Sequence, residues 1–361
     1  MEQTSQRELR QVDPAWTLGE LMAHITSALT SSGPALSQGP SKYLSVEPEI
    51  ALVIHTSGST GGPKEVALTS RALIASAQSS NKFLGAKRGN TWSLLLPLTH
   101  IAGINVLIRS IELESNPIDL RNHQGKFPDA DFTAIVPTHL YRALNGDENL
   151  LHHLQNAEAV LVGGAKLSDE LRVRAIAAGM NIVESYGMTE TSGGCIYNGQ
   201  PLEGVEIEIS SEGLIKISGN TLASTYLGSQ EQWSKSFDGK WFTTSDIGLI
   251  ENGKLRVISR VDDVVISGGE NVSLDAIQKL ITDNFPLISA AAFALPDSEW
   301  GNIIHLALAG GEIPSEDEIR NLLEENLGSF AKPKKIHRLD RIPLTSLGKV
   351  NREQLIEMVA K

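Results

Sequence analysis

The stretch HTSGSTGGPKEV, residues 55–66, combines glycines, hydroxyl side chains and one lysine directly after an apolar run at 50–54. Glycines let backbone amides approach an anion closely, hydroxyls donate further hydrogen bonds, and Lys64 adds a positive charge. The pattern therefore predicts a phosphate-binding loop at the end of a buried strand. It is not a Walker A loop, because Lys64 follows Pro63 and precedes Glu65 rather than a serine or threonine. Taken alone, such a loop also fits an ordinary turn.

A second group of chemically useful residues is SYGMTE, residues 185–190, which follows another strand-like run. Tyr186 offers a flat face to a purine, Thr189 offers a hydroxyl to a phosphate, and Glu190 offers the kind of oxygen that Mg²⁺ prefers. The glycines of 163–165 predict a floor beside it, since ligands of open α/β sheets bind at strand ends. Each segment by itself also fits a strand end followed by a turn.

Three further charged residues stand in polar segments later in the chain. Asp246 ends WFTTSD and can accept hydrogen bonds from two ribose hydroxyls. Arg260 opens RVDD, and Lys349 lies in PLTSLGKVNR. In isolation these residues also fit a turn, a solvated charge cluster and an exposed surface lysine.

The elements that must position these residues alternate between strands and helices from residue 50 to about 190, which predicts an α/β fold with a parallel sheet covered on both faces. Ser and Thr caps predict helices from Thr69–Ser70 to Phe83 and from Ser168 to Ala178. Residues 31–41 are predicted to form a loop. The predicted strands are Ile50–Ile54, Trp92–Leu96, Phe132–Val136, Ala159–Val162 and Asn181–Val183.

The rest of the chain predicts a β-rich subdomain over about 203–259 and a separate α+β unit after it. In the α+β unit we expect helices to follow the caps Ser273 and Ser315. This gives a large domain at 1–259, a hinge at 260–263 and a small C-terminal domain at 264–361. The other predicted strands are Val205–Ile209, Gly213–Ser218, Gly253–Ser259, Ile288–Ala294 and Ile303–Ala309.

Composition excludes several classes of protein. The chain has 361 residues and a net charge of −12, which disfavours nucleic acid as a partner and anionic membranes as a surface. The single Cys195 cannot form an internal disulfide, which fits a reducing compartment. The first residues lack the apolar core of a signal peptide, and no apolar run reaches the roughly 20 residues of a membrane span. We therefore expect a cytoplasmic protein without membrane insertion that acts on small molecules.

The order of these motifs resembles the adenylate-forming superfamily of acyl-CoA synthetases, luciferases and peptide-synthetase adenylation domains. TSGSTGGPKEV resembles its phosphate loop, SYGMTE its adenine and magnesium motif, FTTSD its ribose aspartate, RVDDVVISGGENVS its hinge, and PLTSLGKVNR its lysine loop. The resemblance runs from about residue 49 to the end. Glu65 stands where glycine is usual, and TSD replaces the common TGD. The segment before the phosphate loop is short for the superfamily, so we expect a truncated large domain, with a homodimer covering the surface left open.

The resemblance implies ATP, Mg²⁺ and coenzyme A as cofactors or co-substrates. Lys349 would bridge the reacting carboxylate and the α-phosphate, which Thr189 also touches, and Glu190 would hold the metal. Asp246 and Arg260 would bind the ribose. The remaining nucleotide-binding positions would be Thr56, Ser57, Gly58, Ser59, Thr60 and Lys64 around the outer phosphates, and Gly163, Gly164, Ala165, Ser185, Tyr186, Gly187 and Met188 around the adenine.

The resemblance also implies two half-reactions. A carboxylate first attacks the α-phosphate of ATP and releases pyrophosphate, and the thiol of coenzyme A then displaces AMP. In this superfamily the small domain rotates between the steps about the position matched here by Asp262. Lys349 would leave the site after the first step, and Ser267, Gly268 and Gly269 would then line the path of the thiol.

Within the superfamily the chain most resembles the o-succinylbenzoate–CoA ligases of menaquinone biosynthesis, in their short actinobacterial form. The resemblance lies in LPLTHIAGINVLIRS, IVPTHLYRAL, AVLVGGAKL and YGMTETSGGCIYNGQPLEGVEI. His100 would border the acyl pocket, and Gly193 and Gly194 would make room for a planar acid. Arg142, and after it Arg109, is the candidate partner of the second carboxylate. A synthetase for another aryl or fatty acid, a carrier-protein adenylating enzyme and a non-catalytic nucleotide-binding relic remain alternatives.

Overall fold

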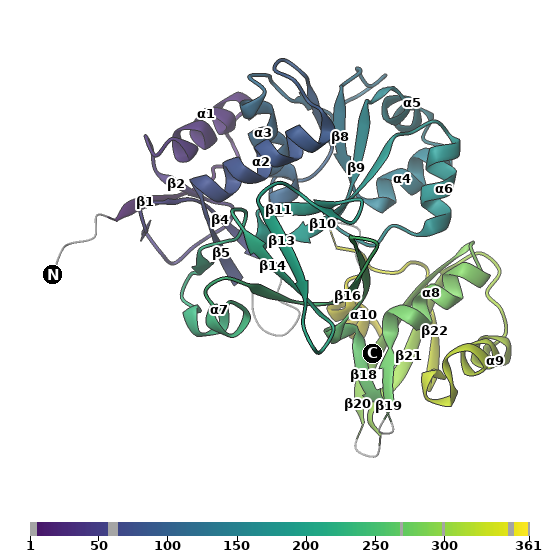
Figure 1. Cartoon of the computed structure of the whole chain (residues 1–361). Coiled ribbons are helices and arrows are strands. Elements are labelled where there is room, and N and C mark those ends of the chain that lie inside the picture. Colours follow the sequence, from purple (N-terminus) through teal and green to yellow (C-terminus); the bar gives the residue numbers. More distant parts are fainter. Residues whose placement is uncertain (1–5, 57–63, 268–269, 298–299, 346–349, 360–361) are drawn as a thin grey trace. The chain divides into compact units, whose positions relative to one another are not determined.

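The computed structural model describes residues 6–56, 64–267, 270–297, 300–345 and 350–359. The chain divides into two compact units (Figure 1). The first comprises Met1–Thr244 with Leu249–Arg256, and the second comprises Ser245–Gly248 with Val257–Lys361. The division passes through two long strands, β16 (Phe242–Glu251) and β17 (Lys254–Arg260). Every helix in the part of the chain that the structure describes is too short or too polar to span a lipid bilayer.

The first sheet of the large unit is mixed, whereas the sequence predicts a parallel sheet. Its β4 (Ile50–Thr56) pairs in parallel with β2 (Ala35–Ser37) but antiparallel with β5 (Lys64–Thr69). The predicted loop at 31–41 is also wrong in part, because β2 within it is a fully buried strand. The order of the six strands is β15-β5-β4-β2-β1-β3, where β15 is Thr225–Tyr226, β1 is Arg7–Gln11 and β3 is Ser45–Val46.

The second sheet carries the other four strands predicted for this half of the chain. Its strand order is β12-β11-β10-β9-β8-β6-β7, and the run from β10 to β7 is parallel throughout. Because β9 and β10 are parallel neighbours, the segments that follow them leave the sheet at the same edge. The bounds are β12 Gln200–Pro201, β11 Gly193–Tyr197, β10 Ile182–Met188, β9 Ala159–Val162, β8 Phe132–Ile135, β6 Trp92–Leu94 and β7 Ile118–Asp119.

Helices cover these sheets, and the predicted caps are confirmed: Thr69 caps α2 and Ser168 caps α6. The helix α2 contacts strands of both sheets, whereas α3 contacts β6, β8 and β11 of the second sheet and is buried over most of its length. A cluster of aliphatic side chains packs α4, α5 and α6 against β8, β9 and β10. The bounds are α1 Leu18–Leu29, α2 Ser70–Leu84, α3 Ile101–Glu112, α4 Pro137–Leu144, α5 Glu148–Asn156, α6 Asp169–Ala177 and α7 Gln230–Ser236.

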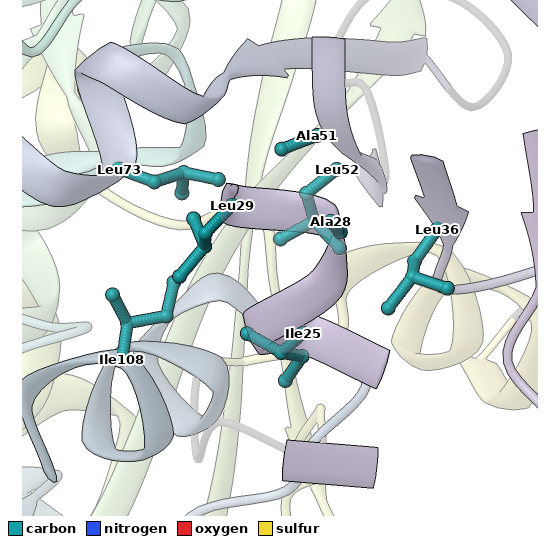
Figure 2. Close-up of a pocket in the computed structure, with 8 residues that line it drawn as sticks. All are labelled: Ile25, Ala28, Leu29, Leu36, Ala51, Leu52, Leu73 and Ile108. Carbon is teal, nitrogen blue, oxygen red and sulfur yellow. The ribbon is translucent and has the colours of Figure 1, made fainter. Parts of the chain in front are cut away.

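A small cavity lies in the core between α1, α2, α3 and the first sheet. Figure 2 shows that the side chains lining it are all aliphatic, from Ile25 on α1 to Ile108 on α3. A cavity without polar groups offers nothing to orient a substrate, so we regard it as a packing defect and not as a functional site.

The predicted β-rich subdomain is confirmed as a third sheet with the order β13-β14-β16-β17. Here β13 is Val205–Ile209 and β14 is Leu214–Gly219, close to their predicted bounds. The sequence did not predict β16, in which buried residues alternate with half-buried or exposed ones over FTTSDIGL. This strand and β17 carry two of the predicted site residues.

The second unit is built on a three-stranded sheet, in which β21 (Gly301–Gly310) pairs antiparallel with β20 (Ile288–Asp297) and in parallel with β22 (Lys335–Arg338). Alternation along the strands gives the sheet two buried faces: Ala292 and Leu306 pack with α8 and α9, whereas Phe293 packs with α10. Ser273 and Ser315 cap α8 and α9 as predicted. The remaining bounds are α8 Leu274–Asn284, α9 Glu316–Leu327, α10 Arg352–Val359, β18 Val264–Ser267 and β19 Glu270–Ser273.

Candidate active site

The predicted phosphate loop joins β4 to β5 in the first sheet. Thr56 ends β4, and it lies opposite Lys64, the first residue of β5, in the antiparallel register. The predicted residues Ser57, Gly58, Ser59 and Thr60 lie outside the described residues. Glu65, which replaces the usual glycine, is half-buried and accepts a hydrogen bond of 2.6 Å from the hydroxyl of Ser41. The Glu65 side chain is therefore held by the segment before β4, and Lys64 keeps its own position at the start of β5.

Glu190 lies in a short 3₁₀ turn, Thr189–Thr191, that directly follows β10. Buried Thr191 fixes this turn, because its hydroxyl donates to the carbonyl of Gly193 at 2.7 Å and accepts from the amide of Met188 at 2.9 Å. The backbone carbonyl of Glu190 accepts from the amide of Ala223 at 2.8 Å. The turn thus presents the Glu190 carboxylate from a fixed backbone.

Lys64 and Glu190 are brought together by Tyr226, a residue that the sequence did not single out. The Tyr226 hydroxyl donates to Oε1 of Glu190 at 2.7 Å, and the ammonium of Lys64 lies 4.7 Å from the centre of the Tyr226 ring. Burial, and after it the Glu190 carboxylate, raises the pKa of the Tyr226 phenol, which stays protonated. No local pattern marks Tyr226, since its place depends on the pairing of β15 with β5.

The predicted adenine segments are neighbours in the second sheet. Val162 ends β9 opposite Glu184 of β10, so that residues 163–165, which follow β9, come next to Ser185 and Tyr186 within β10. The approach is close: a Cβ atom at Gly163 would lie 3.2 Å from the carbonyl oxygen of Ser185. Gly164 has a φ of 79°, which strongly favours glycine. Gly164 and Ala165 are exposed, whereas the residues from Ser185 to Thr189 are half-buried.

The residues present fit a nucleotide bound with Mg²⁺. No cluster of three or more His, Cys, Asp or Glu side chains suited to a metal occurs within the described ranges. Mg²⁺ at nucleotide sites instead takes one or two carboxylates together with substrate phosphates, and Glu190 beside a lysine supplies that arrangement. Its Oε1 atom is held by Tyr226, which leaves Oε2 for a cation.

The predicted ribose residues are paired within the second unit. Asp246 on β16 is buried, and its Oδ1 accepts from Nη1 of Arg260 on β17 at 2.9 Å. The Arg260 side chain remains 42% exposed. The arrangement holds a carboxylate in one orientation beside a cation that can also reach solvent.

Two of the predicted acyl-pocket residues, Gly193 and Gly194, lie on β11, which α3 contacts. His100 is the N-terminal cap residue of α3, and Asn105 on the same helix donates to the carbonyl of Ser192 at 2.8 Å. Space is tight at the glycines of β11: a Cβ atom at Gly193 would lie 2.2 Å from Nδ2 of Asn105, and one at Gly194 would lie 2.0 Å from Oγ of Ser185. Both glycines are needed for close packing at this point.

The two candidate arginines differ in their surroundings. Arg109 is 3% exposed, donates to the Tyr197 hydroxyl at 3.1 Å and lies 4.9 Å from the Trp92 ring centre. Arg142 is exposed and forms an ion pair of 3.0 Å with Asp147. Both therefore have partners of their own in this structure.

The predicted hinge and the predicted path of the thiol belong to the second unit. Asp262 lies in a short 3₁₀ turn, Val261–Asp263. Ser267 is buried at the end of β18, opposite Glu270 of β19. The predicted residues Gly268, Gly269 and Lys349 lie outside the described residues.

Comparison with known proteins gives the family. Residues 20–221 match the AMP-binding enzyme family, and residues 281–349 match the AMP-binding enzyme C-terminal domain. The chain belongs to the AMP-binding enzyme family.

Named relatives and solved structures agree with this assignment. The chain is 32% identical to the probable 2-succinylbenzoate–CoA ligase of Mycobacterium tuberculosis, over 94% of this chain and 95% of that protein. It is 28% identical to the 2-succinylbenzoate–CoA ligase of Listeria monocytogenes, over 86% and 70%.

Among solved structures, it matches o-succinylbenzoate CoA synthetase from Bacillus subtilis in complex with its acyl-adenylate intermediate, with a TM-score of 0.74, 23% identity and coverage of 96% and 82%. It also matches ATP-bound MatB from Rhodopseudomonas palustris, with a TM-score of 0.77, 22% identity and the same coverage. At these identities the structural matches establish the fold, which is that of the adenylate-forming enzymes.

Proposed function

We propose that the chain is an AMP-forming acid–thiol ligase that converts o-succinylbenzoate (2-succinylbenzoate) to its coenzyme A thioester, a step of menaquinone biosynthesis. The observation that carries the proposal is the match, over nearly the full length of both chains, to a relative named for this activity. The grouping of Lys64, Tyr226 and Glu190 supports it, because a metal–triphosphate would need one cation and one carboxylate near each other, and both residues contact Tyr226.

In the first half-reaction, a carboxylate oxygen of the acid forms a bond to the α-phosphorus of ATP, and the bond from that phosphorus to the β-bridging oxygen breaks. Both reactants are anionic, so positioning and charge neutralisation dominate. A magnesium ion held at Glu190 would supply charge neutralisation at the phosphates. Thr56, Lys64 and the loop 57–60 would hold the outer phosphates, and Thr189 the α-phosphate.

The remaining nucleotide-binding residues would act by orienting the nucleotide. The segments 163–165 and 185–188 would bound the adenine, with Tyr186 stacking on it. Asp246 would accept hydrogen bonds from ribose hydroxyls, with Arg260 fixing its carboxylate. Lys349 would lie between the carboxylate and the α-phosphate and offset the charge on both.

In the second half-reaction the thiolate of coenzyme A attacks the acyl carbon, and the bond from this carbon to the AMP oxygen breaks. Ser267, Gly268 and Gly269 would line the approach of the thiol after a rotation about Asp262. His100, Gly193 and Gly194 would shape the acyl pocket. Arg142, whose side chain is exposed, and after it the buried Arg109 would be the candidate partners of the second carboxylate of the acid.

The proposed chemistry also leads to proposals for the location and the oligomeric state of the protein. We place it in the cytoplasm, where ATP and coenzyme A are available. The buried Cys195 thiol, whose pKa burial raises to about 12, would stay inert there. A homodimer remains our proposal for its oligomeric state, and light scattering of the purified protein tests it.

The activity is tested by incubating the protein with Mg·ATP, coenzyme A and a panel of carboxylic acids, with detection of acyl-CoA by mass spectrometry and of pyrophosphate by a coupled assay. We expect a thioester from o-succinylbenzoate. The matched control is Lys64→Ala, which should lower the rate by at least about tenfold, since it removes a charge from the phosphate site, and which excludes a contaminating synthetase.

The other outcomes discriminate between the alternatives. A thioester from another acid alone would keep the mechanism and refute the substrate. ATP binding without pyrophosphate release from any acid would favour a nucleotide-binding relic. Pyrophosphate release without thioester would favour transfer to a carrier protein.

A further inference from the structure

Tyr226 is held rigidly, although it lies in a strand of two residues. Its Cα pairs with Val66 of β5, two residues after Lys64, and the amide of Leu227 donates to the carbonyl of Glu65 at 2.8 Å. On its other side the ring packs edge-on against Trp233, with ring centres 5.1 Å apart, and the residue is only 2% exposed. A side chain anchored in this way loses little additional entropy when a ligand binds.

This rigid ring contacts two residues of the candidate active site that come from different sheets. Lys64 belongs to the first sheet, and Glu190 follows β10 of the second sheet. The hydroxyl of Tyr226 donates to the Glu190 carboxylate at 2.7 Å, and the face of its ring lies 4.7 Å from the Lys64 ammonium. Tyr226 is therefore a physical link between the lysine of the phosphate loop and the carboxylate proposed to hold the metal.

We propose that Tyr226 is a positioning residue that fixes Oε1 of Glu190 and the ammonium of Lys64, so that a metal–triphosphate meets both in one geometry. This inference rests on the proposed function, because it assigns Glu190 to the metal and Lys64 to the phosphates.

The physical argument has two parts. A carboxylate that accepts a hydrogen bond on one oxygen has a fixed orientation and presents the other oxygen to a cation, and such supporting hydrogen bonds contribute strongly to metal affinity. The phenol hydroxyl gives this bond directly, since it lies 2.7 Å from Oε1 of Glu190. The ring face attracts the ammonium and keeps it from pairing directly with Glu190 before the nucleotide arrives.

The test is Tyr226→Phe, which removes the hydroxyl and keeps the ring. ATP binding is measured by isothermal titration calorimetry, once over a range of Mg²⁺ concentrations and once in excess EDTA. We expect the Mg²⁺ concentration for half-maximal enhancement of ATP binding to rise by roughly tenfold or more. Binding of ATP in EDTA should change by less than about twofold, since the contact of the ring with Lys64 remains.

A second variant tests the contribution of the Tyr226 ring. Tyr226→Leu removes both contacts, so it should show the same loss of metal dependence and in addition weaken ATP binding in EDTA by a few-fold, in keeping with a cation–π contact of about 0.5–1 kcal/mol. Tyr43→Phe is the matched control, because it removes a phenol hydroxyl from a neighbouring cluster without touching Glu190 or Lys64. It should leave both titrations unchanged.

Three results would overturn the inference. The first is an unchanged Mg²⁺ dependence in Tyr226→Phe. The second is an equal loss of ATP binding with and without metal, which would indicate a role in folding alone. The third is a loss in Tyr43→Phe as large as in Tyr226→Phe. These binding measurements need no acid substrate, so failure of the proposed activity would be visible separately, as wild-type protein that binds Mg·ATP with the expected metal dependence but forms no thioester.

Discussion

At the scale of single residues, the second unit contains two histidines that share one hydrogen bond. Nδ1 of His305 lies 2.9 Å from Nε2 of His337, and the two rings are stacked with their centres 5.1 Å apart. Burial lowers the pKa of both side chains, and the charge of Lys335 lowers each further, as His337 does for His305. The pair therefore favours a state in which at least one ring is neutral, since one nitrogen must accept.

This pair predicts that the second unit loses stability in mild acid. In the unfolded chain both histidines bind protons below a pH of about 6.5. In the folded unit their pKa values are lower, so the unfolded state binds more protons as the pH falls, and the free energy of unfolding decreases with it. The contribution of the two histidines to the free energy of unfolding is complete above about pH 6.5, and it is lost as the pH falls below this value.

Urea unfolding at pH 8 and pH 5 measures this effect, with hydrogen exchange of β20–β22 peptides as the readout for the unit. His337→Gln should reduce the difference between the two pH values. The control His152→Gln, at an exposed histidine, should leave the difference unchanged. A His337→Gln variant as sensitive to pH as the wild type would contradict the argument.

At the scale of elements, the position of α3 depends on a glycine. A Cβ atom at Gly103 would lie 2.2 Å from the carbonyl oxygen of Pro97, a backbone atom that cannot rotate away. Gly103→Ala should therefore displace the start of α3, which carries His100, and destabilise the large unit by about 1–3 kcal/mol.

The chain supplies a matched control in another helix. Gly19 lies in the first turn of α1, is exposed, and an added Cβ there would meet no heavy atom within 4 Å. Gly19→Ala should stabilise by about 0.4–1 kcal/mol, because it reduces the entropy of the unfolded chain. Urea unfolding followed by tryptophan fluorescence measures both variants. A loss of the same size in both would refute a specific role for the contact with Pro97.

Elements whose signals are local could be predicted from the sequence. The helix α8 was predicted to follow the cap Ser273, since its cap and its apolar face are both features of the local sequence. The pairing of β4 with β5 could not be predicted in the same way. It joins segments on either side of a polar loop, and the apolar run of β4 fits a parallel or a mixed sheet equally well.

The candidate site shows the same division. Lys64 and Glu190 were candidates because each lies in a recognisable motif. Tyr226 was not a candidate, because its contacts with them depend on the pairing of residues 66 and 226, which nothing in the local sequence encodes. Likewise, the sequence around the candidate Arg142 does not predict that the Arg142 guanidinium pairs with Asp147.

At the scale of the whole molecule, the proposed residues are divided between the two compact units. Lys64, Glu190 and the adenine segments belong to the large unit, whereas Asp246, Arg260 and Lys349 belong to the second. If one site must stabilise two different transition states in turn, groups carried on separate units can be exchanged between the steps. The two half-reactions should then depend on different residues.

Lys349→Ala tests whether the two half-reactions depend on different residues. The lysine is proposed to offset charge during attack of the carboxylate on the α-phosphate, so its loss should slow adenylation by at least about a hundredfold. It has no proposed part in the attack of the thiol, so formation of thioester from synthetic acyl-adenylate and coenzyme A should stay within a few-fold of the wild type. Pyrophosphate release measures the first step, and single-turnover mass spectrometry measures the second. Lys279→Ala, at an exposed lysine of α8, should change neither step by more than about twofold. An equal loss of both steps in Lys349→Ala would mean that the lysine supports one shared geometry, and exchange of groups between the steps would then be excluded.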